Sequence, residues 1–231
     1  MTPDERWLAA VWPVVRRQLP APPAQVIEIG CGPLGGFVPM LRAGGYGATG
    51  IDPEAPEQPG YHRVGFEAFD PPGPVDAVVA CTSLHHVADL GRVLDLAHGA
   101  LAPGGVMAVV EWARERFDEP TARWCFERLP PAEGADGADG EPGWLAERQE
   151  QWQASGGSWA DYCRSWAQAE GMHSGQDILR ELQARFATEE LGYGPYFFPD
   201  LRDTSEAEER AAIDAGQIQA TRIDYHGHRR S

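Results

Sequence analysis

The chain has 231 residues, with 19 basic side chains against 35 acidic ones, which gives a formal net charge of −16. A surface this acidic repels phosphate backbones and anionic lipids, so we expect neither nucleic acid nor a membrane as a partner. All 19 basic residues are arginine, which excludes chemistry that needs a Schiff-base lysine.

The first 112 residues alternate between helical and strand patterns. The sequence Thr2-Pro3-Asp4-Glu5 has the form of a capping box, and apolar residues follow it at helical spacing. Short apolar runs come next at residues 26–29, 47–52, 76–81 and 106–112, with helical spacing between them at 37–43 and 90–101. This alternation predicts an α/β fold, with a doubly wound parallel sheet and helices on both faces.

The pattern changes after Trp112. Helices are predicted at residues 118–129, 144–154, 158–170 and 175–184, and strands return at 185–193 and 218–226 around a helix at 205–215. We divide the chain into an N-terminal helix (1–23), a ligand-binding α/β core (24–112), a helical insertion (113–184) and C-terminal strands that complete the sheet (185–231). The acidic, glycine-rich stretch at 130–143 is expected to be a mobile loop.

A glycine-rich turn, VIEIGCGPLGG, occupies residues 26–36 after the first predicted strand. Glycines allow the backbone to turn tightly and approach a ligand, and Gly30, Gly32 and Gly35 satisfy the GxGxxG pattern. Asp52 ends the next strand, where a carboxylate accepts hydrogen bonds from ribose hydroxyls. A nucleotide-like ligand is therefore expected here, and on spacing alone a nicotinamide cofactor also fits.

Glu28 favours a different ligand. Its carboxylate, at the end of the first strand, suits an ammonium group better than a pyrophosphate, which it repels. The segment SLHHV at residues 83–87 and the turn LAPGG at 101–105 follow in order. In these residues the chain resembles the class I S-adenosylmethionine-dependent methyltransferases, and within them a small-molecule group marked by an SLHHV segment and an LxPGG turn. The resemblance covers residues 24–112 and is weaker in the C-terminal region.

The resemblance implies a Rossmann-like methyltransferase fold with a mostly parallel, seven-stranded sheet whose last strand is antiparallel. Residues 218–226 are the candidate for that strand, paired with residues 185–193. It also implies that residues 113–184 form a helical lid inserted after the fifth strand. Such a lid would recognise the acceptor and exclude water from a reactive sulfonium.

S-adenosylmethionine is the cofactor that the resemblance implies. Glu28, Gly30 and Gly32 match the motif that holds its methionine part, and Asp52 matches the acid that binds both ribose hydroxyls. The expected cofactor-binding residues are Glu28, Gly30, Cys31, Gly32, Asp52, Pro53, Phe66, Glu67, Thr82 and Ser83. The family often has a Gly-Asp pair that meets the adenine, whereas this chain has Phe66 and Glu67 after Gly65. Stacking by Phe66, or a contact from Glu67, would replace that acid.

Methyl transfer is an in-line displacement on a carbon activated by positive sulfur. The protein therefore supplies alignment and, for a protonated nucleophile, a base. This chemistry requires no metal, and no metal ligand is predicted. We expect His85 to be the base and Glu111 to be its partner or a substrate anchor, with His86 as the second candidate. A packing role for both histidines stays open.

Two other function classes stay open at this point. An NAD(P)-dependent oxidoreductase uses the same glycine turn but needs a second nucleotide-binding half, where residues 113–184 look helical. A protein that binds S-adenosylmethionine without transferring methyl, as a regulator or for another reaction such as a cyclisation, would show the same pattern. The expected acceptor is a flat or apolar small molecule, and the sequence specifies neither the methylated atom nor the oligomeric state.

Other features have structural interpretations. Trp152, Trp159 and Trp166 recur at seven-residue steps, which favours one buried helical face over an acceptor-binding box. The segment YHGHRR at residues 225–230 suggests a metal or an anion as one interpretation, but the expected one is a solvated tail. The four cysteines form no CxxC pair, and no signal peptide or apolar membrane span is evident. These features indicate reduced thiols in a cytoplasmic protein.

Overall fold

The computed structural model describes residues 1–130 and 143–230 of the chain. The loop expected at 130–143 therefore lies almost wholly outside the described residues. Contacts divide the chain into two compact units, which are described separately. The sheet unit comprises Val11–Trp112, His173–Gly192 and Ile223–Ser231, and the helical unit comprises Met1–Ala10, Ala113–Met172 and Tyr193–Arg222.

Seven strands form one sheet in the order β3-β2-β1-β4-β5-β7-β6. They are β1 (Gln25–Ile29), β2 (Gly47–Ile51), β3 (Tyr61–His62), β4 (Val75–Cys81), β5 (Leu101–Trp112), β6 (Phe186–Gly194) and β7 (Arg222–Arg229). Strands β1 to β5 pair in parallel. The strand order reverses between β1 and β4, which confirms the predicted doubly wound α/β fold.

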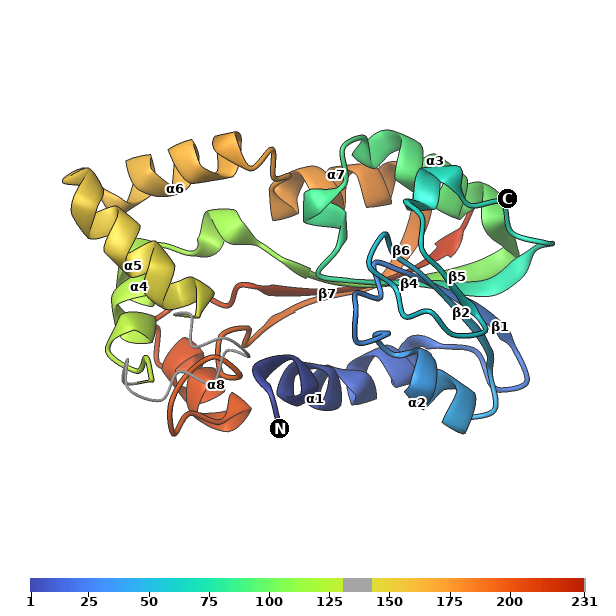
Figure 1. Cartoon of the computed structure of the whole chain (residues 1–231), viewed down its shortest axis with the longest axis horizontal. Helices are drawn as coiled ribbons and strands as arrows, with labels where there is room; N and C mark the ends of the chain where they lie inside the picture. Colours follow the sequence, from blue (N-terminus) through green and yellow to red (C-terminus); the bar gives the residue numbers. More distant parts are fainter. Residues whose placement is uncertain (131–142, 231) are drawn as a thin grey trace. The chain divides into compact units, whose positions relative to one another are not determined.

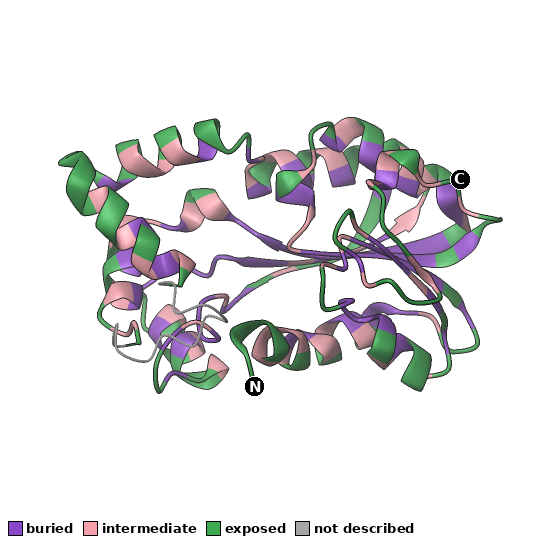
Figure 2. Ribbon diagram, viewed as in Figure 1, coloured by how far each residue is buried: buried purple, intermediate pink, exposed green. Residues whose placement is uncertain are grey.

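Helices cover both faces of the sheet unit. Figure 1 shows α2 (Val38–Ala43) on one face, and α3 (Leu90–Ala100) and α7 (Gly175–Arg185) on the other. The central strands are buried along most of their length (Figure 2), and the side chains of Val78 and Val109 are completely buried. The apolar runs of the sequence form these strands because a strand covered on both faces needs apolar residues at successive positions.

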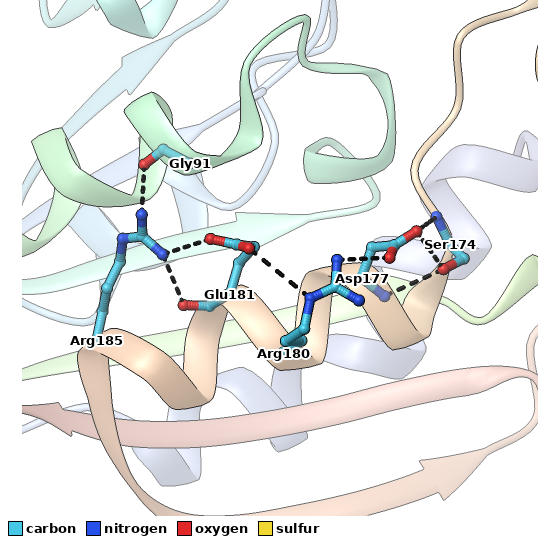
Figure 3. A network of polar contacts seen from close by, with 6 residues as sticks. All are labelled: Gly91, Ser174, Asp177, Arg180, Glu181 and Arg185. Carbon is cyan, nitrogen blue, oxygen red and sulfur yellow. Dashed lines mark hydrogen bonds and ion pairs between the residues drawn. The ribbon is translucent and has the colours of Figure 1, made fainter.

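Helix α7 is joined to α3 by charged side chains (Figure 3). The Arg185 guanidinium donates to the Gly91 carbonyl at 3.2 Å and to the Glu181 carboxylate at 2.6 Å. It also donates to the Asp95 carboxylate at 2.6 Å. At its other end, α7 begins with a capping box in which Ser174 and Asp177 bond reciprocally. This helix, which ends the expected insertion, therefore packs as part of the sheet unit.

Strand β7 runs antiparallel to both of its neighbours. At one end, the Ala113 N–H donates to the Thr221 carbonyl at 2.7 Å, and at the other the Arg229 guanidinium bonds to the Leu101 carbonyl. On the β6 side, a Cβ at Gly227 would lie 3.0 Å from the Ala187 carbonyl oxygen, and one at Gly194 would meet Arg222. The predicted pairing and direction of the last strand are confirmed. The expectation of a solvated tail at 225–230 is wrong, because β7 includes residues 225–229.

The parallel register places the carboxyl ends of β1, β2, β4 and β5 at one edge of the sheet. Gly30, just after β1, donates its N–H to the Ile51 carbonyl at 2.8 Å. Thr82, just after β4, donates its N–H to the Val110 carbonyl at 2.8 Å. Residues that follow these strands therefore meet at this edge, where open α/β sheets bind ligands.

The helical unit is built around aromatic side chains. Its helices are α4 (Glu119–Phe126), α5 (Trp144–Ser155), α6 (Trp159–Ala169), α8 (Glu206–Asp214) and the first residues of α1 (Pro3–Gln18). Trp159 is 1% exposed, donates its indole N–H to the Phe117 carbonyl at 2.6 Å, and packs against the rings of Phe126 and Trp152. Across the described residues, every helix is too short or too polar to cross a membrane.

The interpretation of Trp152, Trp159 and Trp166 as one helical face is wrong. Trp152 lies on α5, whereas Trp159 and Trp166 lie on α6. Helix α5 ends at Ser155, and the left-handed φ of 65° at the following Gly156 redirects the chain before α6 begins. The seven-residue spacing therefore spans two helices, and only Trp159 is fully buried among the three.

Candidate active site

The glycine turn after β1 has an open side. Gly30 and Gly32 have φ values of 75° and 62°, in the left-handed region that favours glycine. A Cβ on Gly30 would lie 2.1 Å from Ser83 Cβ, so this glycine is required by close packing. A Cβ on Gly32 would meet no atom of the described residues within 4 Å. Space for a ligand therefore begins at Gly32.

Glu28 is a buried carboxylate beneath this turn, with 1% of its surface exposed. Both of its oxygens accept from the Phe37 N–H, at 3.0 and 2.8 Å. Burial raises its pKa to about 8, although the backbone N–H groups of Phe37 and Val38 act in the opposite direction. The one charged side chain that shifts this pKa is Asp52, which is also acidic. A cationic ligand at this position would stabilise its ionised form.

Asp52 joins the end of β2 to the glycine turn. Its Oδ2 accepts from the Gly32 N–H at 3.0 Å, and its Oδ1 accepts from the Glu54 N–H at 2.7 Å. These bonds fix the carboxylate beside the open side of the turn, while Pro53 after it is exposed. The structure therefore brings Asp52, Glu28 and the glycines together, as the spacing predicts.

Thr82 and Ser83 lie at the end of β4, next to the turn. Ser83 donates its hydroxyl to the Ile29 carbonyl at 2.9 Å. Thr82 has a φ of 48°, which is uncommon for a residue with a branched side chain. Such strained backbone is often found at functional sites, where the surrounding structure holds it in place.

The other expected cofactor residues, Cys31, Phe66 and Glu67, are buried or half-buried. Cys31 is 5% exposed, and burial raises the pKa of its thiol to about 12, so it is a protonated packing residue. Phe66 is buried in the short helix η1 (Phe66–Ala68), and Glu67 beside it is half-buried. Tyr61 of β3, which the sequence patterns do not indicate, packs against the turn and donates to the Gly35 carbonyl at 3.4 Å.

His85 and Glu111 form a buried hydrogen-bonded pair. His85 lies in η2 (Leu84–His86) after β4, and Glu111 lies near the end of β5. His85 Nδ1 is 2.7 Å from Glu111 Oε2, and the two side chains are 6% and 0% exposed. The Leu84 N–H donates to Glu111 Oε1 at 2.6 Å, and the Trp112 N–H donates to Oε2 at 2.9 Å. The predicted pairing of these two residues is therefore present in the structure.

Electrostatics keep the Glu111 carboxyl group ionised. Burial pushes its pKa upward, but the nearby His85 and the N–H groups of Trp112 and Leu84 outweigh burial and hold the pKa below its ordinary value. An ionised Glu111 carboxylate can only accept hydrogen bonds. His85 Nδ1 therefore carries the proton and donates a hydrogen bond to it. In the neutral imidazole, Nε2 is then an acceptor, which is the protonation state that a general base needs.

His86 and His173 are the neighbours of this pair. The His86 ring is exposed, and its centroid lies 4.1 Å from that of His85. His173 donates its backbone N–H to the His85 carbonyl at 3.0 Å and its ring Nε2–H to the Val87 carbonyl at 2.8 Å. It fixes the backbone on both sides of His86. No sequence pattern indicates His173, which lies far from η2 along the chain.

A family model described as a methyltransferase domain matches residues 6–134, more than half of the chain. The chain belongs to this methyltransferase-domain family. The comparison with curated proteins gives no match. Family membership confirms the predicted methyltransferase and decides against the NAD(P)-dependent oxidoreductase.

Solved structures share the fold. An S-adenosylmethionine-dependent methyltransferase from Mesorhizobium loti is 19% identical, with a TM-score of 0.55 over 95% of this chain and 98% of that chain. The N-methyltransferase NodS from Bradyrhizobium japonicum WM9, solved with S-adenosyl-L-homocysteine, is 14% identical, with a TM-score of 0.54 over 100% and 89%. The geranyl diphosphate C-methyltransferase from Streptomyces coelicolor A3(2) is 13% identical, with a TM-score of 0.52 over 96% and 76%. These similarities confirm the predicted Rossmann-like methyltransferase fold.

Proposed function

We propose that this protein transfers a methyl group from S-adenosylmethionine to a small-molecule acceptor, with His85 as general base. The observation that carries the proposal is the buried His85–Glu111 pair at the same sheet edge as Glu28 and Asp52. A glycine turn by itself accounts only for binding of the cofactor. Methyl transfer to a hydroxyl or an ammonium group also needs a proton acceptor, and His85 supplies one.

The residues of the turn fit the proposed cofactor. The buried carboxylate of Glu28 would pair with its ammonium group, and Asp52, fixed by Gly32 and Glu54, would bind its ribose hydroxyls. The open side of Gly32 leaves room for the ligand backbone. When bound, S-adenosylmethionine supplies a methyl group on positively charged sulfur. Thr82 and Ser83 would line the wall next to the turn, and Cys31 contributes packing.

The His85–Glu111 pair would accept the proton of the acceptor. Glu111 holds the proton on Nδ1 of His85, which leaves the lone pair of Nε2 for the acceptor's proton. The same carboxylate stabilises the imidazolium that forms. Its two backbone hydrogen bonds, from Leu84 and Trp112, keep it in place, so the histidine is oriented before the acceptor binds.

A small molecule is the acceptor class that we favour. The net charge of −16 disfavours polyanions such as nucleic acid. Among the similar structures, one is named as acting on geranyl diphosphate, a small molecule. The assignment to a group with an SLHHV segment, the role of residues 113–184 as an acceptor lid, and the cytoplasmic location stay predictions.

Calorimetry followed by a labelled-methyl assay tests the proposal. Purified protein would be titrated with S-adenosylmethionine, S-adenosylhomocysteine and NADPH, and then incubated with labelled cofactor and a panel of small alcohols, phenols and amines. We expect the unaltered protein to bind the first two ligands and to transfer methyl to an acceptor. His85→Gln should lose the transfer but still bind S-adenosylmethionine. Binding of NADPH alone would contradict the cofactor. Cofactor binding without transfer to any acceptor would favour the non-transferring alternative.

A further inference from the structure

A cluster of metal-binding side chains lies on strands β6 and β7, apart from the candidate active site. Glu189 belongs to β6, and His226 and His228 belong to β7. Successive side chains of a strand point to opposite faces, so two histidines that are two residues apart share one face. The antiparallel pairing of the strands places Glu189 beside them. The three side chains thus come from two neighbouring strands rather than from a flexible tail.

The two histidine side chains converge on one carboxylate oxygen of Glu189. Glu189 Oε2 lies 3.3 Å from His226 Nδ1 and 3.0 Å from His228 Nε2. One donor atom from each residue lies within 4.8 Å of the other two. At metal–ligand distances of about 2.0–2.1 Å, two ligands of tetrahedral zinc lie roughly 3.3 Å apart. The two nitrogen–oxygen separations are close to this spacing.

The hydrogen bond between His228 Nδ1 and Gly104 favours a role for His228 Nε2 as a metal ligand. His228 Nδ1 lies 3.0 Å from the Gly104 carbonyl oxygen, which only accepts, so Nδ1 must carry the proton. In the neutral ring, the lone pair of Nε2 then points at the Glu189 carboxylate, which also offers a lone pair. A cation bound by both atoms removes this repulsion. Metal-ligating histidines typically donate their other N–H to a carbonyl in this way.

His226 offers its other ring nitrogen to the same carboxylate. Its Nδ1 faces Glu189 and is the atom that would bind the ion. The two side chains are 13% and 54% exposed, so the imidazole is fixed by packing and the carboxylate can adjust to it. A site with rigid histidines and one movable carboxylate needs little rearrangement to close around an ion.

We propose that Glu189, His226 and His228 bind a divalent transition-metal ion of the zinc class. Two imidazoles and one carboxylate are ligands that zinc accepts, with a fourth position left for water. Both histidines also line a cavity of about 300 Å³, together with Pro103 and Gly104. The side chains of His228 and Glu189 are 33% and 54% exposed, so solvent reaches the cluster and the ion has a path of entry.

This site is distinct from the proposed methyl-transfer site. The C-terminal end of β7 lies beside Leu101, at the start of β5, whereas Glu111 lies near the end of β5. The ion would join β6 to β7 and, through His228, to the Gly104 turn before the apolar part of β5. We therefore expect it to stabilise this edge of the sheet. Its presence does not depend on the proposed function.

Zinc titration of tag-free protein, freed of metal with a chelator, tests the proposal. Calorimetry should give one Zn²⁺ per chain, and Co²⁺ should give the visible absorption of tetrahedral coordination. Loss of a group that only hydrogen-bonds to a metal ligand already lowers metal affinity by roughly 10- to 100-fold. Loss of a ligand itself, in Glu189→Gln or His228→Gln, should therefore lower Zn²⁺ affinity by at least about tenfold. The matched control is His98→Gln, since His98 lies on α3 and is not part of the cluster; its affinity should match the unaltered protein.

Thermal unfolding provides a second readout. A saturating ion that binds the folded state alone should raise Tm by a few degrees, and Glu189→Gln should abolish the rise. Because Glu189 is exposed, this variant retains the fold, which circular dichroism would verify. Absence of stoichiometric Zn²⁺ binding by the unaltered protein would overturn the proposal. Equal affinity in Glu189→Gln, His228→Gln and the unaltered protein would overturn it as well.

Discussion

The Nδ1 atom of His85 lies 2.7 Å from Oε2 of Glu111, and both side chains are buried where two parallel strands end. The carboxylate also accepts backbone N–H groups from Leu84 and Trp112, so it orients the ring and is itself held from both sides. Buried pairs of this kind are costly to break, since removal of one member leaves the other without a partner. The arrangement therefore has consequences for both stability and catalysis.

Changing Glu111 to glutamine should lower kcat without a comparable loss of cofactor affinity. An amide no longer favours the proton on Nδ1 of His85, and a general base typically contributes about 10²–10⁴-fold to the rate. Single-turnover methyl transfer and cofactor calorimetry would measure the two effects separately. The control is His86→Gln, on an exposed ring, for which we expect a smaller loss. Equal kcat in Glu111→Gln and the unaltered protein would refute the assigned role.

Cofactor binding should release a proton at neutral pH. Burial raises the pKa of Glu28 to about 8, so the free protein holds this carboxyl protonated at pH 7. An ammonium group beside it favours the ionised form, so affinity should weaken below pH 8 by up to roughly tenfold per pH unit. Calorimetry in buffers of different ionisation enthalpy measures the released proton. In Glu28→Gln both the release and the pH dependence should disappear, and their persistence would place the titrating group elsewhere.

The same pKa predicts how Glu28 affects stability in the free protein. Its folded pKa of about 8 lies above its ordinary value of 4.5, so between these values the folded state binds more protons than the unfolded state. The free energy of unfolding should therefore decrease as pH rises through this window. Urea unfolding at pH 5, 7 and 9 would show this slope, and Glu28→Gln should flatten it.

Two glycines of the turn should respond differently to alanine. In Gly30→Ala the new Cβ would lie 2.1 Å from Ser83 Cβ, so we expect a large loss of stability. In Gly32→Ala the Cβ enters open space, and the left-handed φ of 62° costs about 1–2 kcal/mol. Gly32→Ala should therefore fold yet lose cofactor affinity, because its methyl group fills the ligand space. Unchanged cofactor affinity in a folded Gly32→Ala would mean that the ligand lies elsewhere.

Trp159 should be the most sensitive aromatic residue of the helical unit. It is buried among Phe117, Phe126 and Trp152, so Trp159→Ala should destabilise the protein by about 3–5 kcal/mol. Trp159→Phe retains a ring but loses the hydrogen bond to the Phe117 carbonyl, at a cost of roughly 1 kcal/mol. Urea unfolding would rank the two variants. The half-buried Trp166 serves as the control, with a smaller effect expected for Trp166→Ala.

Local sequence patterns, formed by residues close together in the chain, predict much of this structure. Apolar runs locate the central strands, and the parallel sheet then brings the residues after β1, β2, β4 and β5 to one edge, which is why His85 and Glu111 could be paired in advance. Contacts between distant segments leave no such pattern. Nothing in the sequence around His173 indicates that it supports His85, and Tyr61 packs on Gly35 without a recognisable motif.

The wrong interpretations have the same origin. The three tryptophans at seven-residue steps appear helical because spacing alone does not reveal the break at Gly156. The C-terminal histidines appear solvated because the partners of β7, which are β5 and β6, come from elsewhere in the chain. A short polar strand gains its stability from those neighbours rather than from its own residues.

Calorimetric titration of S-adenosylmethionine into the unaltered protein and Asp52→Ala measures whether the glycine turn and Asp52 bind the cofactor. Asp52 is fixed beside the glycine turn by the N–H groups of Gly32 and Glu54, and hydrogen bonds to a charged group contribute about 1.5–3 kcal/mol each. We predict micromolar-range or tighter binding by the unaltered protein, a loss of at least about tenfold in Asp52→Ala, and no change in Asp70→Ala, at an exposed acid. Equal affinity in Asp52→Ala, or no binding by the unaltered protein, would contradict the account.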